Sequence, residues 1–109
     1  MDNLKDTIQK IIDFCEQRDW EQFHNSKDLA VAISIEASEL LELFLWKTDE
    51  EVNYERLKEE LADILSYCLL LANRHNLDIN EIISEKIDKN CKKYPISKSK
   101  GTKKKYSDL

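Results

Sequence analysis

Residues 57–71, LKEELADILSYCLLL, contain the pattern that decides the fold of this chain. Their apolar side chains recur at intervals of three or four residues, which is the period of an amphipathic α-helix: Leu57, Leu61, Ile64, Cys68 and Leu71. We therefore expect a helix over about residues 54–75, with these side chains facing inward and His75-Asn76 at its end.

Three more helices are expected on either side of this one. Leu4, Ile8, Ile11 and Cys15 predict a first helix over about 3–17, followed by an ordered connection at 18–24 that carries two large aromatic residues. A second helix is expected from a cap at Asn25 or Ser26 to about Trp46, followed by a charged loop at 48–53. A further helix is expected from an Asp78 cap to about Lys93, where Pro95 stops it.

The composition favours an all-α fold. One Gly and one Pro in 109 residues leave little material for the turns of a β protein. The length fits one domain, and we expect a helical domain at 1–94 with a basic tail at 95–109. Two interpretations of the tail stay open, a flexible solvated segment and a basic flap over an anionic ligand. A four- to five-helix bundle of this size has a small core, so we expect it to be completed by homo-oligomerisation.

The charge is unevenly distributed. Residues 1–94 contain 12 basic and 21 acidic residues, whereas the tail contains five Lys and one Asp. An acidic body argues against nucleic-acid binding, which requires a basic surface. The three cysteines have no metal-ligand spacing, and no signal peptide or membrane span is evident. We therefore expect a cytoplasmic protein with no membrane partner.

Two pairs of carboxylates carry the chemistry, Glu36 with Glu39 and Glu60 with Asp63. Each pair is spaced i, i+3, so both of its acids lie on one helix face, about 60° apart. A helical wheel places Glu36 and Glu60 inside the apolar stripes of their helices. Burying a carboxylate in that position costs on the order of several kcal/mol unless a paired cation or a metal compensates for it. Oxygen donors without His or Cys favour Mg²⁺, with Mn²⁺ as an alternative.

These acids also have two other interpretations. A carboxylate-bridged di-iron bundle normally has Glu-x-x-His on two helices, and His24 and His75 do not occupy such positions. A non-catalytic helical interaction module would carry the same acids as a solvated face. Glu42 and Glu59 point away from the apolar stripes and are expected to be ordinary surface residues, although Glu42 would still be within reach of the site as an outer carboxylate.

A series of motifs runs along almost the whole chain: RDWEQFH at 18–24, E-x-x-E-L at 36–40, FLW at 44–46, EELADIL at 59–65, K-x-x-x-K-Y-P ending at Pro95, and a closing Lys-rich segment from Lys100 to Leu109. This order resembles the MazG-like nucleoside triphosphate pyrophosphohydrolases and is most similar to their dCTP pyrophosphatase branch. The resemblance implies an all-α dimer or tetramer that hydrolyses a nucleoside triphosphate, with dCTP as an example, to the monophosphate and pyrophosphate.

The resemblance also implies roles for individual residues. Glu36, Glu39, Glu60 and Asp63 match the magnesium ligands, and Glu36 or Glu39 is the expected proton acceptor. Five other residues match positions in the substrate site: Trp20 and Trp46 around the base, Tyr67 in the pocket, and Lys86 and Asn90 near the phosphates or sugar. Without the resemblance, the two tryptophans are more often core or interface anchors than base platforms. Tyr67 can then be interpreted as a core aromatic residue, and Lys86 and Asn90 as surface residues.

Overall fold

The computed structural model describes residues 3–109, and within that range it contains five α-helices, three 3₁₀ turns and no strand. The all-α class predicted from the sequence is therefore confirmed. None of the helices in this range combines the length and the apolar character needed to cross a membrane. The cytoplasmic location stays a prediction.

The chain divides into two compact units, one ending at Asn76 and the other running from Leu77 to Leu109. The first unit contains α1 (Leu4–Gln17), η1 (Glu21–Phe23), α2 (Ser26–Glu42), η2 (Asp49–Glu51) and α3 (Tyr54–Arg74). The second contains α4 (Ile79–Lys93), α5 (Ile96–Ser99) and η3 (Tyr106–Asp108). The predicted functional division between 1–94 and 95–109 stays a prediction.

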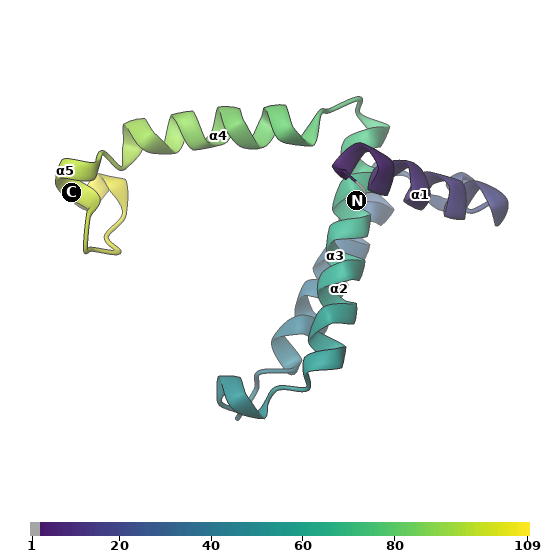
Figure 1. Cartoon of the computed structure of the whole chain (residues 1–109), viewed down its shortest axis with the longest axis horizontal. Coiled ribbons are helices and arrows are strands. Elements are labelled where there is room, and N and C mark those ends of the chain that lie inside the picture. The colour runs from purple at the N-terminus through teal and green to yellow at the C-terminus, as the bar shows by residue number, and fades with distance from the viewer. Residues whose placement is uncertain (1–2) are drawn as a thin grey trace. The chain divides into compact units, whose positions relative to one another are not determined.

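In the first unit, α2 and α3 pack along each other and α1 packs against α3 (Figure 1). The most deeply buried side chains come from each of these helices and from the turn that follows α2: Cys15, Leu29, Leu43 and Ala72. This core is small, as expected for a chain of this length.

Helices α2 and α4 begin at caps predicted from the sequence, and α3 begins at a cap of the same kind that was not predicted. The side chains of Asn25 and Asp78 each accept a hydrogen bond from the backbone N–H three residues later, and Asn53 does the same for α3. These bonds satisfy N–H groups that the first turn of a helix leaves unpaired. At the other end of α3, Asn76 takes a left-handed conformation (φ 56°), which ends the helix where His75-Asn76 predicted.

Helix α2 ends earlier than predicted, at Glu42 instead of about Trp46. The backbone N–H groups of Leu43, Phe44 and Leu45 donate to carbonyls three residues back, so the chain tightens after Glu42. Trp46 then has a φ of 62°, which an α-helix cannot contain. Apolar periodicity continues through 43–46, and it therefore extended the predicted helix too far.

The inward face of α3 also differs at one position from the prediction. Leu57, Ile64, Cys68 and Leu71 are partly buried, but Leu61 is 42% exposed. Leu61 lies about 100° from Glu60 on the helix, which places it at the margin of the buried face.

In the second unit, part of the predicted tail folds back on the end of α4. The rings of Tyr94 and Tyr106 meet edge to face with centroids 6.1 Å apart, and the Lys93 Nζ lies 4.9 Å from the Tyr106 ring centroid. Gly101 makes the turn with a φ of 81°, a conformation that glycine adopts without steric cost. The tail thus has local structure, and its role as a flap stays a prediction.

The buried Leu29 gives a test of the α2–α3 packing. Because this side chain is only 2% exposed, Leu29→Ala should lower the free energy of unfolding by about 2–5 kcal/mol. Ser38→Ala on the exposed face of the same helix should change it by less than about 0.5 kcal/mol. Urea denaturation followed by circular dichroism measures both, and equal effects would show that α2 does not pack as described.

Candidate metal centre and adjoining pocket

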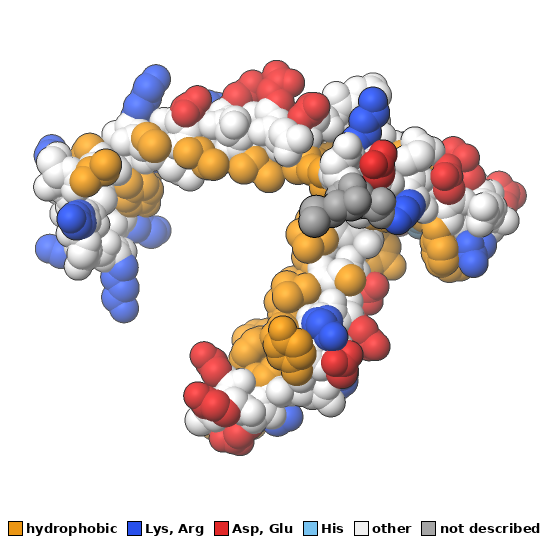
Figure 2. All heavy atoms as spheres, in the orientation of Figure 1, with side chains coloured by type: hydrophobic (Ala, Val, Ile, Leu, Met, Phe, Trp, Pro, Cys, Tyr) orange, Lys and Arg blue, Asp and Glu red, His pale blue; other side chains and the backbone are white. Residues whose placement is uncertain are grey.

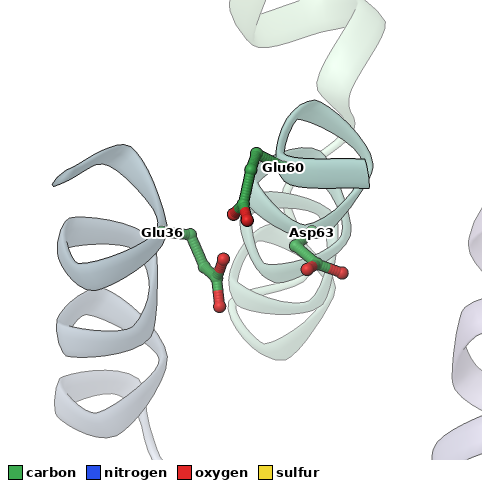
Figure 3. A group of neighbouring side chains, drawn as sticks. All are labelled: Glu36, Glu60 and Asp63. Atoms are coloured by element: carbon green, nitrogen blue, oxygen red, sulfur yellow. The ribbon is translucent and has the colours of Figure 1, made fainter. Parts of the chain in front are cut away.

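Three carboxylates from two helices converge in the first unit. Glu36 comes from α2, and Glu60 and Asp63 come from successive turns of α3 (Figure 3). One carboxylate oxygen from each lies within 4.8 Å of those of the other two. The side-by-side packing of α2 and α3 brings these acids together, so residues far apart in the sequence form one cluster.

Two of the cluster's oxygens are buried without a hydrogen-bond donor. Glu60 is 8% exposed, and the Oε2 atoms of Glu36 and Glu60 are both buried without a partner among the described residues. Ionised carboxylates offer only acceptors, so the two groups cannot satisfy each other unless one carries a proton. A buried unpaired carboxylate oxygen is costly and requires either a proton or a cation.

The pKa of Glu36 reflects this conflict. It is raised from 4.5 to about 7, chiefly because a protonated Glu36 can hydrogen-bond to Glu60. Partial burial and the negative charges of Glu39 and Asp63 raise the pKa further. In the absence of a cation, the cluster thus favours a proton on Glu36 near neutral pH.

The cluster has the donor set of a site for a hard divalent cation. Its ligands are carboxylate oxygens on two rigid helices, and two of these oxygens are buried with no other partner. Hard cations such as Mg²⁺ prefer oxygen ligands of this kind. The residues present therefore fit a metal centre.

The fourth predicted ligand, Glu39, lies outside this group of three. It is half-buried one turn after Glu36, and its charge contributes to the raised pKa of Glu36, so it borders the cluster. Its role as a ligand stays a prediction. Glu42 and Glu59 are both exposed, which agrees with their expected place on the surface.

An open pocket of about 480 Å³ adjoins the cluster, with Asp63 in its wall. Its volume falls within the range of small-molecule sites. Trp20 lines the pocket and meets Phe14 edge to face with ring centroids 5.5 Å apart. Tyr67 also lines it, and burial followed by the charges of Glu36 and Asp63 raises the pKa of its hydroxyl.

The other predicted substrate residues lie elsewhere. Trp46 is 99% exposed and does not line this pocket. Lys86 and Asn90 are exposed on α4 in the second unit, and their roles stay predictions.

Several pocket residues were not singled out from the sequence. Ser66 and Leu70 follow Asp63 at three and seven residues, so helical spacing from the acidic motif would have found them. The rest come from α1 and the connection to α2, and only the packing of α1 against α3 identifies them: Lys10, Phe14, Cys15 and His24. Ile11, an expected apolar residue of the first helix, also lines the pocket.

Comparisons with known proteins agree on one family. The model of the MazG-like family matches residues 31–109. The dCTP pyrophosphatase 1 of Bos taurus is 40% identical across 97% of this chain and 68% of its own length, and that of Homo sapiens is 37% identical across 97% and 67%. A pyrophosphatase crystal structure from Archaeoglobus fulgidus superposes with a TM-score of 0.78 at 35% identity, covering 87% of this chain and 94% of that one.

The raised pKa of Glu36 predicts how the stability of the metal-free protein depends on pH. A carboxyl group whose pKa rises on folding stabilises the fold fully below its ordinary value of 4.5, and this contribution is lost as pH rises through about 7. In EDTA, the free energy of unfolding should therefore fall between about pH 5 and about pH 8.

Two variants isolate the contribution of Glu36. Glu36→Gln should flatten this pH dependence, because glutamine cannot lose a proton. Glu42→Gln, an exposed neighbour on the same helix, should leave it unchanged. Urea titrations at a series of pH values measure the slope, and an equal slope in wild type and Glu36→Gln would contradict the assignment.

Proposed function

Because this chain belongs to the MazG-like family, we propose that it is a nucleoside triphosphate pyrophosphohydrolase that releases the nucleoside monophosphate and pyrophosphate. The observation that supports this most directly is the convergence of Glu36, Glu60 and Asp63 beside a pocket of nucleotide-binding size. Relatives named dCTP pyrophosphatase suggest a pyrimidine deoxynucleotide such as dCTP as the substrate.

The proposed metal ligands are Glu36, Glu39, Glu60 and Asp63, with Mg²⁺ as the ion and Mn²⁺ as an alternative. When bound, such an ion supplies positive charge toward the phosphates and makes a water molecule more acidic. The acidic cluster would otherwise repel a triphosphate. Substrate binding should therefore depend on the cation.

Glu36 and Glu39 are the proposed proton acceptors. In the reaction, the oxygen of water bonds to the α-phosphorus while the bond from that phosphorus to the bridging oxygen breaks, and pyrophosphate leaves. The proton of the water passes to a carboxylate oxygen. The resemblance to the MazG-like family implies this role for one of the two, and both border the cluster formed with Glu60 and Asp63.

The pocket lined by Trp20 and Tyr67 is the proposed base subsite. Its wall combines aromatic and aliphatic side chains with a few polar groups, a combination typical of small-molecule sites. Asp63 belongs to both the pocket wall and the acidic cluster, so a base in the pocket would direct its phosphates toward the cluster. Lys86 and Asn90 are proposed to contact the phosphates or sugar.

The exposed apolar side chains support the proposed homo-oligomer, a dimer or tetramer. Several lie on the outer surface of α2 and of the turn that follows it: Val31, Ile35, Leu41, Leu45 and Trp46. Hydrophobic side chains also line one side of α4 (Figure 2). Clustered exposed apolar side chains are typical of a surface that binds another protein. Trp46 is the most exposed of these side chains among the described residues.

A non-catalytic interaction module with a solvated acidic face is the alternative. The burial of Glu60 argues against it, because surface acids in such a module would have solvent around both oxygens. A cation response separates the two functions.

Removing one of the carboxylate ligands on α3 should greatly reduce activity and abolish the response to the cation. With Mg²⁺ and a panel of canonical and modified nucleoside triphosphates, the wild-type protein should release pyrophosphate, and Glu60→Gln or Asp63→Asn should lower kcat/KM by at least about 100-fold. Mg²⁺ with nucleotide should raise the Tm of wild type and leave that of either variant unchanged.

Glu59→Gln is the matched control, since Glu59 is exposed beside Glu60. Release of orthophosphate alone would contradict attack at the α-phosphorus.

The exposed Trp46 tests the oligomer. Trp46→Ala should shift the protein toward monomer in analytical ultracentrifugation, because a large apolar side chain at an interface contributes more than about 1 kcal/mol. Trp20→Ala should raise KM without changing the oligomeric state, since Trp20 lines the pocket of its own chain. A wild-type protein that sediments as a monomer at micromolar concentration would contradict the proposal.

A further inference from the structure

Helix α3 arranges the groups of the site in a fixed order. Leu70, Tyr67 and Ser66 line the pocket, Asp63 lines the pocket and joins the acidic cluster, and Glu60 follows one turn nearer the start of the helix. One further turn in the same direction stands Arg56, four residues before Glu60. Because residues four apart lie on one helix face, Arg56 continues this line of functional groups.

The distances along the helix match the parts of a nucleoside triphosphate. Along the helix axis, Arg56 lies about 16 Å from Tyr67 and about 10 Å from Asp63. A nucleoside triphosphate with its base at Tyr67 and its α-phosphate at the cluster would extend its β- and γ-phosphates past Glu60. The side chain of Arg56 is then the cation that the helix presents to them.

The present contact of Arg56 leaves it available for this purpose. Its Nη2 lies 3.6 Å from the Oε1 of Glu60, and its side chain is 56% exposed. Only the guanidinium end of this ion pair is exposed, because the Glu60 side chain is 10% exposed. A cation bound by Glu60 would replace Arg56 as the partner of the carboxylate, so the guanidinium could then leave without uncovering a buried charge. Glu60 would in turn have both oxygens available for a cation.

The chemistry of the guanidinium suits a phosphate end group. Arginine stays charged at all working pH values and offers donors in a planar fork that pairs with two phosphate oxygens at once. The acidic residues around it repel phosphates, and Arg56 offsets part of this repulsion at the far end of the site from the pocket.

We propose that Arg56 binds the terminal phosphates of the substrate, and pyrophosphate after cleavage. This inference rests on the proposed function for the identity of the ligand. Arg56 would act as a substrate-binding residue, with its main effect on KM and on the affinity for pyrophosphate.

Calorimetric titration of the Mg²⁺-loaded protein with pyrophosphate tests the proposal independently of turnover. Arg56→Gln should weaken pyrophosphate binding about tenfold or more and raise KM for dCTP similarly, whereas Arg56→Lys should recover part of both. Lys58→Gln is the matched control, because Lys58 is equally exposed, is also paired with an acid, Glu55, and lies about 200° away on the helix. It should change neither value.

A second titration, with Mg²⁺ alone, separates phosphate binding from a role in holding Glu60. Arg56→Gln should bind Mg²⁺ as tightly as wild type or more tightly, because a positive charge beside the acids has been removed. Weaker binding of Mg²⁺ alone in this variant would assign Arg56 to the positioning of Glu60 and overturn the proposal. Equal losses of pyrophosphate affinity in Arg56→Gln and Lys58→Gln would overturn it as well.

The outcomes also distinguish this proposal from the proposed function. A wild-type protein that releases pyrophosphate from dCTP, together with unchanged pyrophosphate binding in Arg56→Gln, would overturn the role of Arg56 alone. Arg56-dependent binding of pyrophosphate without hydrolysis of any nucleoside triphosphate would support the phosphate site and overturn the enzyme. A wild-type protein that neither binds pyrophosphate nor hydrolyses a nucleotide would overturn both.

Discussion

The burial of the Glu60 carboxylate against Glu36 is the constraint on which the rest of this structure depends. Two acids placed in the apolar seam between α2 and α3 oppose the packing that holds those helices together. The same packing sets the distance between them. The protein therefore keeps a local cost at the centre of its first unit, and a proton or a divalent cation relieves it.

This constraint connects the two halves of the proposed site. Apolar and aromatic contacts in the pocket suit a flat base, whereas the carboxylates are unsuited to phosphates unless a cation is present. Base recognition and phosphate recognition thus use opposite kinds of surface that meet at Asp63. In the proposed site, a nucleotide and its metal would satisfy both surfaces together, and neither would do so alone.

The helices and the placement of the acids could be predicted from the sequence, because both depend on the spacing of residues close together in the chain. The caps at Asn25 and Asp78 and the helical phase of Glu36 and Glu60 follow from residues a few positions apart, and the all-α class follows from them. The end of α2 could not be predicted, since apolar spacing continues from Leu43 up to the left-handed Trp46. The pocket wall from α1 depends on a tertiary contact that no local pattern encodes. Arg56 has one local signal, its position four residues before Glu60, but the same spacing is typical of an ordinary surface ion pair on a helix.

Helix α3 carries pocket residues, carboxylates and Arg56 on one continuous element, and this has a consequence for how such a site can change over evolution. Insertion or deletion of a single residue within α3 would rotate everything beyond it by about 100° and separate the groups from one another. We therefore expect changes of length to be tolerated only in the connections outside the helices, such as the segment at 43–53. New substrate preferences must therefore arise by exchange of side chains at fixed positions along this helix.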